Sequence, residues 1–320
     1  MHKRKLVITH SLDQTLIDKI ANVIPEWEIV VGKEKSSWEN AVKDAEIVAG
    51  WKTELEALCL KEPTPLRWVQ SWSAGVNSMP LEKLSRNKIM LTSANGVHAY
   101  PISETIFAFM LGLTRKIHTY VNNQQTKTWD HSNLKSEMHR KTVGIIGVGE
   151  IGKETAKIAK AFSMKVIGIR YSGKSERYVD EMYRPEELNL ILPRCDYLVV
   201  TLPLTADTRR LFRREQFELM KPSSFFINIG RGEVVNESDL IAALQAGEIA
   251  GAGLDVFATE PLSSESPLWG MENVIITPHT SGSTEHYHQR LIETIFLPNL
   301  KDYMAGKPPA INAVDYSKGY

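Results

Sequence analysis

The chain has 320 residues, 42% of them hydrophobic and 24% charged, and a chain of this length is expected to build two hydrophobic cores. Lys plus Arg and Asp plus Glu both number 38, so no net field gathers nucleic acid. The 2 cysteines have no Cys or His partner at zinc-ligand spacing, so we expect a reducing compartment with neither a disulfide nor a metal site.

The N-terminal segment MHKRKLVITH is basic, and its apolar run is interrupted by His10 and Asp13. The run is too short for a signal sequence or a membrane span. We therefore expect a cytoplasmic protein that binds neither membranes nor nucleic acid.

In residues 1–98, short β-branched runs alternate with helical patterns. The strand-like runs are KLVIT from Lys5, WEIVV from Trp27, EIVA from Glu46, RWVQS from Arg67 and KIMLT from Lys88. Such alternation predicts βαβ units and a parallel sheet.

A helix is predicted next, because Pro101 precedes apolar residues at helical spacing from Ile102 to Leu113. We expect it to run to about His118. The segment 122–139 is polar and lacks a periodic pattern, so it is predicted to be an exposed arm or loop, whose Trp129 a partner subunit can cover.

Six further strand-like runs follow, separated by helical patterns. They are TVGIIG from Thr142, KVIGI from Lys165, YLVVT from Tyr197, SFFINI from Ser224, GAGLDV from Gly251 and NVIIT from Asn273. Six strands with helices between them predict a doubly wound dinucleotide domain. A last helix, from about Glu285 to Met304 and interrupted near Pro298, is predicted to return to the first domain.

The predicted fold is therefore α/β, with two doubly wound parallel-sheet domains. A Rossmann dinucleotide-binding domain, residues 99–285, is inserted in a flavodoxin-like substrate domain made of residues 1–98 and 286–320.

A glycine fingerprint, Gly147-Val148-Gly149-Glu150-Ile151-Gly152, joins the strand TVGII to the helical pattern KETAKIAKAF. The first glycine permits a tight turn, the second lets the backbone approach a pyrophosphate, and the third lets helix and strand pack closely. The backbone N–H groups of the first helical turn, at Glu150, Ile151 and Gly152, then face the phosphates. An ordinary glycine turn is the alternative, but the strand before and the helix after favour a cofactor.

The residues after the next strand indicate which dinucleotide binds. An NAD enzyme usually carries an acidic residue there for the ribose 2′-OH, whereas this chain has Arg170, Tyr171, Ser172 and Lys174. A guanidinium, a hydroxyl and an ammonium suit a 2′-phosphate. NADP(H) is therefore preferred, and NAD(H) is possible if Arg170 only stacks over adenine.

Three charged residues follow strands of the second domain: Arg231, Glu260 and His279. Ligands bind at the carboxyl ends of strands in such sheets. An Arg grips a carboxylate and polarises the neighbouring carbonyl, and a His exchanges a proton near neutral pH, with an acid to orient the ring. Singly, an interdomain ion pair, a loop end and a helix cap would explain them as well; together they indicate reduction of a 2-oxo acid.

Several motifs in order resemble one known family, the D-isomer-specific 2-hydroxyacid dehydrogenases, which include glyoxylate and hydroxypyruvate reductases. The motifs are SAGVN from Ser73, GIIGVGEIG from Gly144, LPLT from Leu202, INIGRGEVV from Ile227, LDVFATEPL from Leu254 and TPHTSG from Thr277. The resemblance covers nearly the whole chain.

The resemblance implies that Arg231 binds and polarises substrate, that His279 is the acid/base and that Glu260 is its partner. It also implies a substrate-carboxylate loop at Ser73, Ala74, Gly75 and Val76, and cofactor contacts at Leu202, Pro203, Ile229 and Asp255. A homodimer built on the dinucleotide domains, and a hinge that closes on the substrate, are implied as well.

Two positions depart from the family pattern: Asn77 replaces the usual Asp, and Gly230 precedes Arg231 where a hydroxyl residue is common. Formate and phosphite oxidation are disfavoured, because Glu260 stands where formate enzymes have Gln, and Ser73 and Ala74 stand where phosphite enzymes have Lys. A dinucleotide-sensing, corepressor-like scaffold remains the alternative function. Weak candidates for substrate specificity are Trp51, Lys52, Tyr287 and Arg290.

Overall fold

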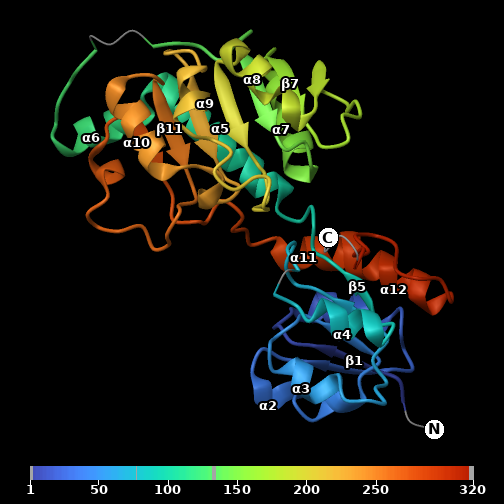
Figure 1. Cartoon of the computed structure of the whole chain (residues 1–320). Coiled ribbons are helices and arrows are strands. Elements are labelled where there is room, and N and C mark those ends of the chain that lie inside the picture. The colour runs from blue at the N-terminus through green and yellow to red at the C-terminus, as the bar shows by residue number, and fades with distance from the viewer. Residues whose placement is uncertain (1–2, 77, 132–134, 317–320) are drawn as a thin grey trace. The chain divides into compact units, whose positions relative to one another are not determined.

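The computed structural model describes residues 3–76, 78–131 and 135–316. The chain forms two compact units, one of Met1–Val97 with Thr284–Tyr320 and the other of His98–Ser283 (Figure 1). The boundaries expected from the sequence were 98/99 and 285/286.

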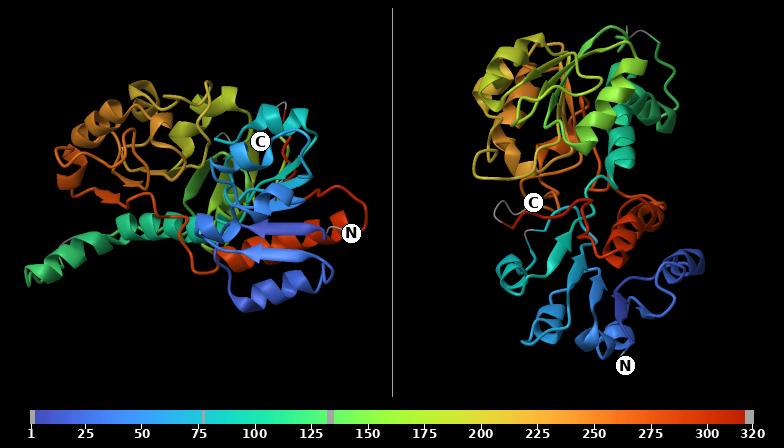
Figure 2. Two further views of the ribbon diagram at one scale, coloured as in Figure 1. Left: turned by 90° about the horizontal axis from the view of Figure 1, so that it is seen from below. Right: turned by 90° about the vertical axis from the view of Figure 1, so that its right-hand side faces the viewer.

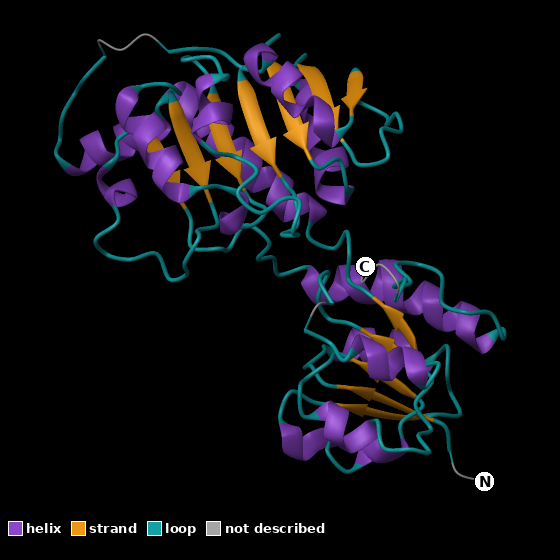
Figure 3. Cartoon of the chain, in the orientation of Figure 1, coloured by secondary structure: helices purple, strands orange, loops and turns teal. Residues whose placement is uncertain are grey.

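The first unit contains a five-stranded parallel sheet in the order β2-β1-β3-β4-β5, which is the flavodoxin-like order and confirms the predicted fold class. Figure 3 shows the strands of each unit in orange and the helices in purple. Its strands are β1 Lys5–Ile8, β2 Glu28–Val31, β3 Ile47–Ala49, β4 Trp68–Gln70 and β5 Met90–Thr92. Its first helices are α1 Gln14–Ala21, α2 Lys35–Trp38, a 3₁₀ turn Ala41–Asp44, α3 Leu55–Cys59 and α4 Leu81–Arg86.

Alternation along each strand divides this core between the two faces of the sheet. Leu6 and Ile8 of β1 pack with α1 and the C-terminal helices, whereas Val7 packs on the opposite face with Trp38 and Leu55. Both faces are covered, as a parallel sheet requires.

The second unit contains a seven-stranded parallel sheet in the order β12-β11-β10-β9-β6-β7-β8. Its strands are β6 Thr142–Ile146, β7 Lys165–Ile169, β8 Glu181–Tyr183, β9 Tyr197–Val200, β10 Phe225–Asn228, β11 Gly251–Leu254 and β12 Val274–Ile276. The Rossmann domain is confirmed, with β8 as a strand beyond the six predicted. The sequence Glu-Met-Tyr of β8 is too short and polar to stand out as a strand.

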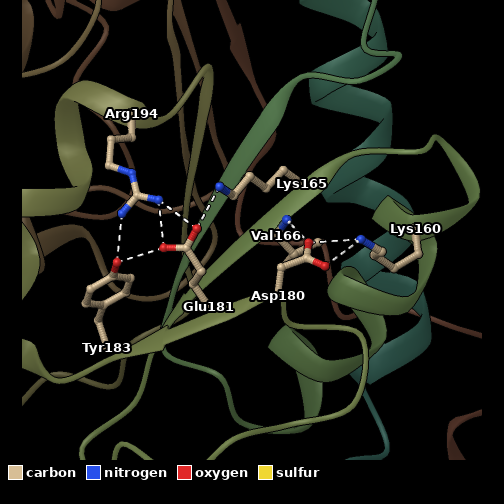
Figure 4. Close-up of polar contacts among 7 residues, drawn as sticks. All are labelled: Lys160, Lys165, Val166, Asp180, Glu181, Tyr183 and Arg194. Atoms are coloured by element: carbon tan, nitrogen blue, oxygen red, sulfur yellow. Dashed lines mark hydrogen bonds and ion pairs between the residues drawn. The ribbon is translucent and has the colours of Figure 1, made fainter.

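Charged side chains hold β8 at the edge of this sheet (Figure 4). The Arg194 guanidinium donates to both carboxylate oxygens of Glu181, at 2.8 and 2.7 Å, and to the hydroxyl of Tyr183. Lys165 on the neighbouring strand lies 2.6 Å from the same carboxylate. Asp180, the residue before β8, pairs with Lys160 of α7 and accepts from the Val166 N–H of β7. These contacts fix the start of β8 against its neighbours.

Helices cover both faces of the second sheet. Helix α5, Ala99–Arg115, and helix α7, Glu150–Ala161, pack on one face around Val143 and Ile145. The opposite face carries α8 Leu188–Ile191, α9 Arg214–Glu218, α10 Glu237–Ala246 and 3₁₀ turns at Pro185–Glu187, Leu192–Arg194, Gly232–Val234 and Pro267–Gly270.

The predicted helix that ends near His118 is interrupted earlier, and helical structure then continues further. Lys116 adopts a left-handed conformation, φ 55°, and closes α5, after which α6 runs over Ile117–Gln125. The prediction of an arm or loop from residue 122 missed the helical structure of 122–125, although these residues are mostly exposed as expected. Trp129 beyond it is 94% exposed, and residues 132–134 lie outside the described residues. Figure 2 (left) shows α6 projecting beyond the sheet of its unit.

The C-terminal helix begins with α11, Tyr287–Leu291, and ends with α12, Leu297–Met304, separated by a π-helical segment, Ile292–Phe296. Pro298 lacks the N–H that would continue the α-helical bonding, which accounts for the predicted interruption. No helix within 3–76, 78–131 or 135–316 is long and apolar enough to span a bilayer.

Candidate active site

The predicted site residues of the second unit follow the carboxyl ends of its strands. Because all seven strands are parallel, these ends share one edge of the sheet. Arg231 follows β10, Glu260 follows β11 and His279 follows β12, three adjacent strands. The glycine loop follows β6, at the point where the strand order reverses.

The glycine loop has the geometry that each glycine was predicted to supply. Gly147 has φ +106°, and a Cβ there would lie 2.8 Å from the Thr201 hydroxyl. A Cβ on Gly152 would lie 2.7 Å from the Gly147 carbonyl oxygen, so this residue sets the close approach of α7 to β6. A Cβ on Gly149, the residue that caps α7, would meet nothing within 4 Å. The loop thus leaves open space beside free N–H groups, which fits a pyrophosphate.

The segment after β7 places Arg170 beside an acid that the sequence prediction overlooked. The Arg170 guanidinium lies 3.3 Å from the Glu176 carboxylate, because the chain reverses through Gly173, φ +63°. Tyr171, Ser172 and Lys174 are exposed on the same turn, and the Ser172 hydroxyl accepts from the Lys174 N–H at 3.4 Å.

Arg231 is exposed at the start of a 3₁₀ turn, and its guanidinium donates to the Gly230 carbonyl at 2.7 Å. Asn228, buried at the end of β10, donates to the Arg231 carbonyl at 3.2 Å and accepts from the Gly230 N–H at 3.0 Å. Asn228 therefore fixes the loop that presents the guanidinium, a role that the sequence did not reveal.

His279 and Glu260 are brought together. The His279 Nδ1 lies 2.7 Å from the Glu260 Oε2, and the other carboxylate oxygen accepts from the Phe257 N–H at 3.0 Å. This arrangement leaves the Nε2 of His279 to face a reactant. The backbone of His279 is left-handed, φ 53°, a conformation that His tolerates better than most residues.

Asp255 is fully buried and holds the loop that carries His279. Its Oδ1 accepts from the Thr277 hydroxyl at 2.5 Å and from the Thr280 N–H at 2.9 Å, and both carboxylate oxygens accept from the Ser281 N–H. The cofactor contact of Asp255 that the resemblance implies stays a prediction. Leu202 and Pro203 lie after β9, and Ile229 is buried after β10.

Gly232, also missed in the sequence, joins the loops of Arg231 and Glu260. A Cβ on this residue would lie 1.9 Å from the Phe257 carbonyl group, so only glycine fits. The neighbouring Ala258 N–H donates to Glu237 at 3.0 Å, which secures the same loop from α10.

In the first unit, the predicted substrate loop follows β4. Ser73, Ala74 and Gly75 are exposed, whereas Val76 is buried in the core. The Ser73 N–H donates to the Ser71 hydroxyl, and the Ser73 carbonyl accepts from the Ala94 N–H. Among the residues that the structure describes, the N–H groups of Ala74 and Gly75 have no acceptor, so both remain available to an anion.

Trp72, next to this loop, is held by the start of α11. Its indole N–H donates to the Nδ1 of His288 at 3.1 Å, its carbonyl accepts from the Tyr287 hydroxyl, and His10 stacks on its ring at 4.6 Å. Burial, reinforced by nearby His288 and Lys52, lowers the pKa of His10 to about 4. Burial also raises the pKa of Tyr287 to about 12. Tyr287, a weak candidate for substrate contact, therefore supports the loop.

Lys52, another weak candidate, donates to the Lys33 carbonyl at 2.5 Å, and its ammonium lies 5.3 Å from the Trp38 ring. Trp51 is partly buried and packs against the core cluster that contains Trp38 and Leu55. Within the described ranges, no group of three or more His, Cys, Asp or Glu side chains is arranged to hold a metal ion.

Three parts of a site lie along one edge of the second sheet: the open glycine loop, which we call the anion cradle, the guanidinium of Arg231, and the imidazole of His279 paired with Glu260. The cradle fits a dinucleotide, the guanidinium fits a carboxylate, and the imidazole exchanges a proton with an oxygen. Together these are the parts needed to interconvert a 2-oxo acid and a 2-hydroxy acid.

Comparison with known proteins agrees with this chemistry. Residues 107–281 match the family model for the D-isomer specific 2-hydroxyacid dehydrogenase NAD binding domain. The chain is 32% identical over 314 residues to a glyoxylate/hydroxypyruvate reductase B from Shigella boydii, covering 95% of this chain and 96% of that protein.

Two solved structures cover nearly all of the chain. A D-isomer specific 2-hydroxyacid dehydrogenase family protein from Aeromonas salmonicida has a TM-score of 0.84 and 32% identity, covering 98% of this chain and 100% of that one. An NADPH-dependent glyoxylate/hydroxypyruvate reductase from Sinorhizobium meliloti, in complex with NADP and sulfate, has a TM-score of 0.80 and 28% identity, covering 99% of this chain and 100% of that one.

Proposed function

The chain belongs to the D-isomer specific 2-hydroxyacid dehydrogenase family and is an NAD(P)-dependent oxidoreductase of 2-oxo acids; we propose that it reduces glyoxylate and hydroxypyruvate to D-2-hydroxy acids with NADPH. The observation that carries the proposal is the pairing of His279 with Glu260 at 2.7 Å on the strand edge that also presents Arg231. The relatives support this substrate class over formate or phosphite oxidation and over a corepressor-like scaffold.

In the proposed mechanism, Arg231 binds the substrate carboxylate and the 2-oxo oxygen. In the first unit, taken by itself, the N–H groups of Ala74 and Gly75 are proposed as anion-binding groups. A reduced nicotinamide, when bound, would supply the hydride to C2. His279, with Glu260 accepting from its Nδ1–H, donates the Nε2 proton to the same oxygen as the C–O double bond becomes single. The neutral imidazole regains its proton from solvent, and the reverse sequence oxidises the 2-hydroxy acid.

The dinucleotide is proposed to lie along the glycine loop, with its phosphates at the N–H groups of Glu150, Ile151 and Gly152. The remainder of the dinucleotide site is proposed to be lined by Asp255, Ile229, Leu202 and Pro203. NADP(H) is preferred because Arg170, Ser172 and Lys174 lie where a 2′-phosphate is bound in this fold, and NAD(H) is accepted more weakly. The NADPH-dependent relative from Sinorhizobium meliloti supports this preference.

A homodimer formed through the second unit is proposed from its exposed apolar side chains. Ile117 is 52%, Val121 50% and Trp129 94% exposed along α6 and the segment that follows. A second copy of the chain is the proposed occupant, and sedimentation of Val121→Lys tests it. We expect this variant to sediment as a monomer and Trp269→Ala, an exposed aromatic elsewhere, to keep the wild-type mass.

A cytoplasmic location is proposed because Cys59 and Cys195 are free thiols.

The activity is tested by following NADPH and NADH absorbance with glyoxylate, hydroxypyruvate, pyruvate and 2-oxoisocaproate. We expect oxidation that depends on the acid, is fastest with the first two, and falls by about 10²–10⁴-fold in His279→Ala. Binding of both dinucleotides without turnover of any acid would refute the reductase and favour the scaffold.

A further inference from the structure

Glu176 is an acidic side chain that the structure brings to the proposed 2′ position, beside Arg170. Its Oε2 lies 3.3 Å from the Arg170 guanidinium and 3.6 Å from the ammonium of Lys153, which is on the first turns of α7. Its Oε1 accepts from the Arg177 N–H at 3.0 Å, which fixes the carboxylate in this position.

The carboxylate is charged at neutral pH. The Arg177 N–H chiefly, with Lys153 and Arg170, lowers the pKa of Glu176 below its usual value. The three side chains are partly covered, with 22% of Glu176, 31% of Arg170 and 34% of Lys153 exposed, so they are held against the protein surface.

The ion pair of Arg170 and Glu176 affects the binding of NADP(H) and of NAD(H) differently. A 2′-phosphate needs the Arg170 guanidinium, so it competes with the Glu176 carboxylate for this cation and lies beside that negative charge. A ribose 2′-OH carries no charge and leaves the ion pair intact. Glu176 therefore weakens binding of NADP(H) and leaves binding of NAD(H) nearly unchanged.

We propose that Glu176 sets the cofactor ratio of this enzyme by competing with the 2′-phosphate for Arg170. The inference rests on the proposed function, because it takes the end of β7 as the site of the adenosine ribose. It also accounts for the missing carboxylate at the strand end: the acid lies six positions later, and the turn at Gly173 returns it to Arg170.

The test measures dissociation constants of NADPH and NADH by fluorescence titration, without substrate. Glu176→Gln keeps the shape and the acceptor for the Arg177 N–H but removes the charge. We expect it to tighten NADPH binding about fivefold to tenfold and to change NADH binding less than about twofold. Raising the salt concentration should shrink the gain.

Two further variants separate competition from a merely structural effect. In the background of Arg170→Gln, Glu176→Gln should alter NADPH binding far less, because the contested guanidinium is gone. Glu154→Gln, which removes an acid paired with Lys157 further along α7, should leave both constants unchanged.

The outcomes distinguish the two proposals. An unchanged NADPH to NADH ratio in Glu176→Gln, with both dinucleotides bound, overturns the role of Glu176 and leaves the reductase intact. An equal gain with and without Arg170 also overturns it. Failure of the wild-type chain to bind either dinucleotide overturns the proposed function and this inference together.

Discussion

At the scale of single residues, the backbone fixes the acids around His279. Glu260 accepts from the Phe257 N–H with the oxygen that does not face the imidazole, and Asp255 accepts from the N–H groups of Thr280 and Ser281. Backbone donors have no side-chain rotamers to lose, so they cost less ordering than side-chain donors would. The imidazole is thus oriented before any substrate arrives.

Replacing the two members of this pair should have unequal effects. His279→Ala removes the proton donor and should lower kcat by about 10²–10⁴-fold. Glu260→Gln keeps a single acceptor oxygen, so either the Nδ1–H or the Phe257 N–H loses its acceptor, and it also removes the charge; it should lower kcat about tenfold. Steady-state kinetics with glyoxylate measures both. NADPH dissociation constants serve as the control and should stay at the wild-type value; a wild-type kcat in Glu260→Gln would contradict the assignment.

At the scale of elements, close backbone contacts connect the catalytic loops. Gly232 is the first residue of the 3₁₀ turn that follows Arg231, and it lies against the carbonyl group of Phe257. The N–H of Phe257 in turn donates to the Glu260 carboxylate. The loops after β10 and β11 therefore have one relative position. Any side chain at residue 232 forces them apart.

Gly232→Ala tests this contact. Its Cβ would lie 1.9 Å from backbone atoms that no rotamer change can move, so the loop must shift. We expect a loss of about 1–3 kcal/mol in the free energy of unfolding, with a fall in kcat larger than that of Glu260→Gln. Urea unfolding and kinetics measure the two effects. Gly270→Ala, whose Cβ meets nothing within 4 Å, should match the wild type in both.

The edge strand β8 gives a pH-dependent prediction. Arg194 first, with Lys165 and Tyr183, lowers the pKa of Glu181 from 4.5 to about 2. A lowered carboxyl pKa in the folded state stabilises the fold above pH 4.5, and this contribution is lost as the pH falls toward 2. The Tm of Glu181→Gln should therefore lie below that of the wild type at pH 7, and the gap should narrow between pH 4.5 and 3.

Solvent screening keeps this effect modest, because the Glu181 side chain is 31% exposed. Glu218→Gln, which removes a single exposed partner of Arg214, should show a smaller gap at pH 7. A gap for Glu181→Gln that persists unchanged to pH 3 would show that the ionised carboxylate does not hold β8.

Elements with strong local signals were predictable from the sequence, and elements defined by tertiary contacts were not. The strand β6, the glycine loop and α7 follow one another along the chain. Their apolar residues are periodic, and their glycines permit a tight turn and close packing of helix on strand. The strand β8 is defined by its ion pairs, and the break at Lys116 by one left-handed residue, so neither leaves a periodic pattern. The pairing of Glu176 with Arg170 depends on a turn whose direction the sequence does not specify.

At the scale of the whole molecule, each unit has its own hydrophobic core. The apolar clusters around Leu6 and Val7 draw only on the first unit, and those around Val143 and Phe226 draw only on the second. Each unit also contains one buried thiol, Cys59 in the first and Cys195 in the second. Burial raises the pKa of both thiols to about 12, so neither forms a reactive thiolate in the folded state.

Alkylation of each cysteine therefore reports the opening of its own unit, read peptide by peptide with mass spectrometry. NADPH at about 100 times its dissociation constant stabilises the unit that binds it by about 2.7 kcal/mol, which slows labelling there about 100-fold. Because the dinucleotide contacts lie in the second unit, we expect Cys195 to be protected to that extent and Cys59 to label at the rate seen without ligand. Equal protection of the two thiols would mean that both units open in one cooperative step, in which case a core confined to each unit does not make them independent.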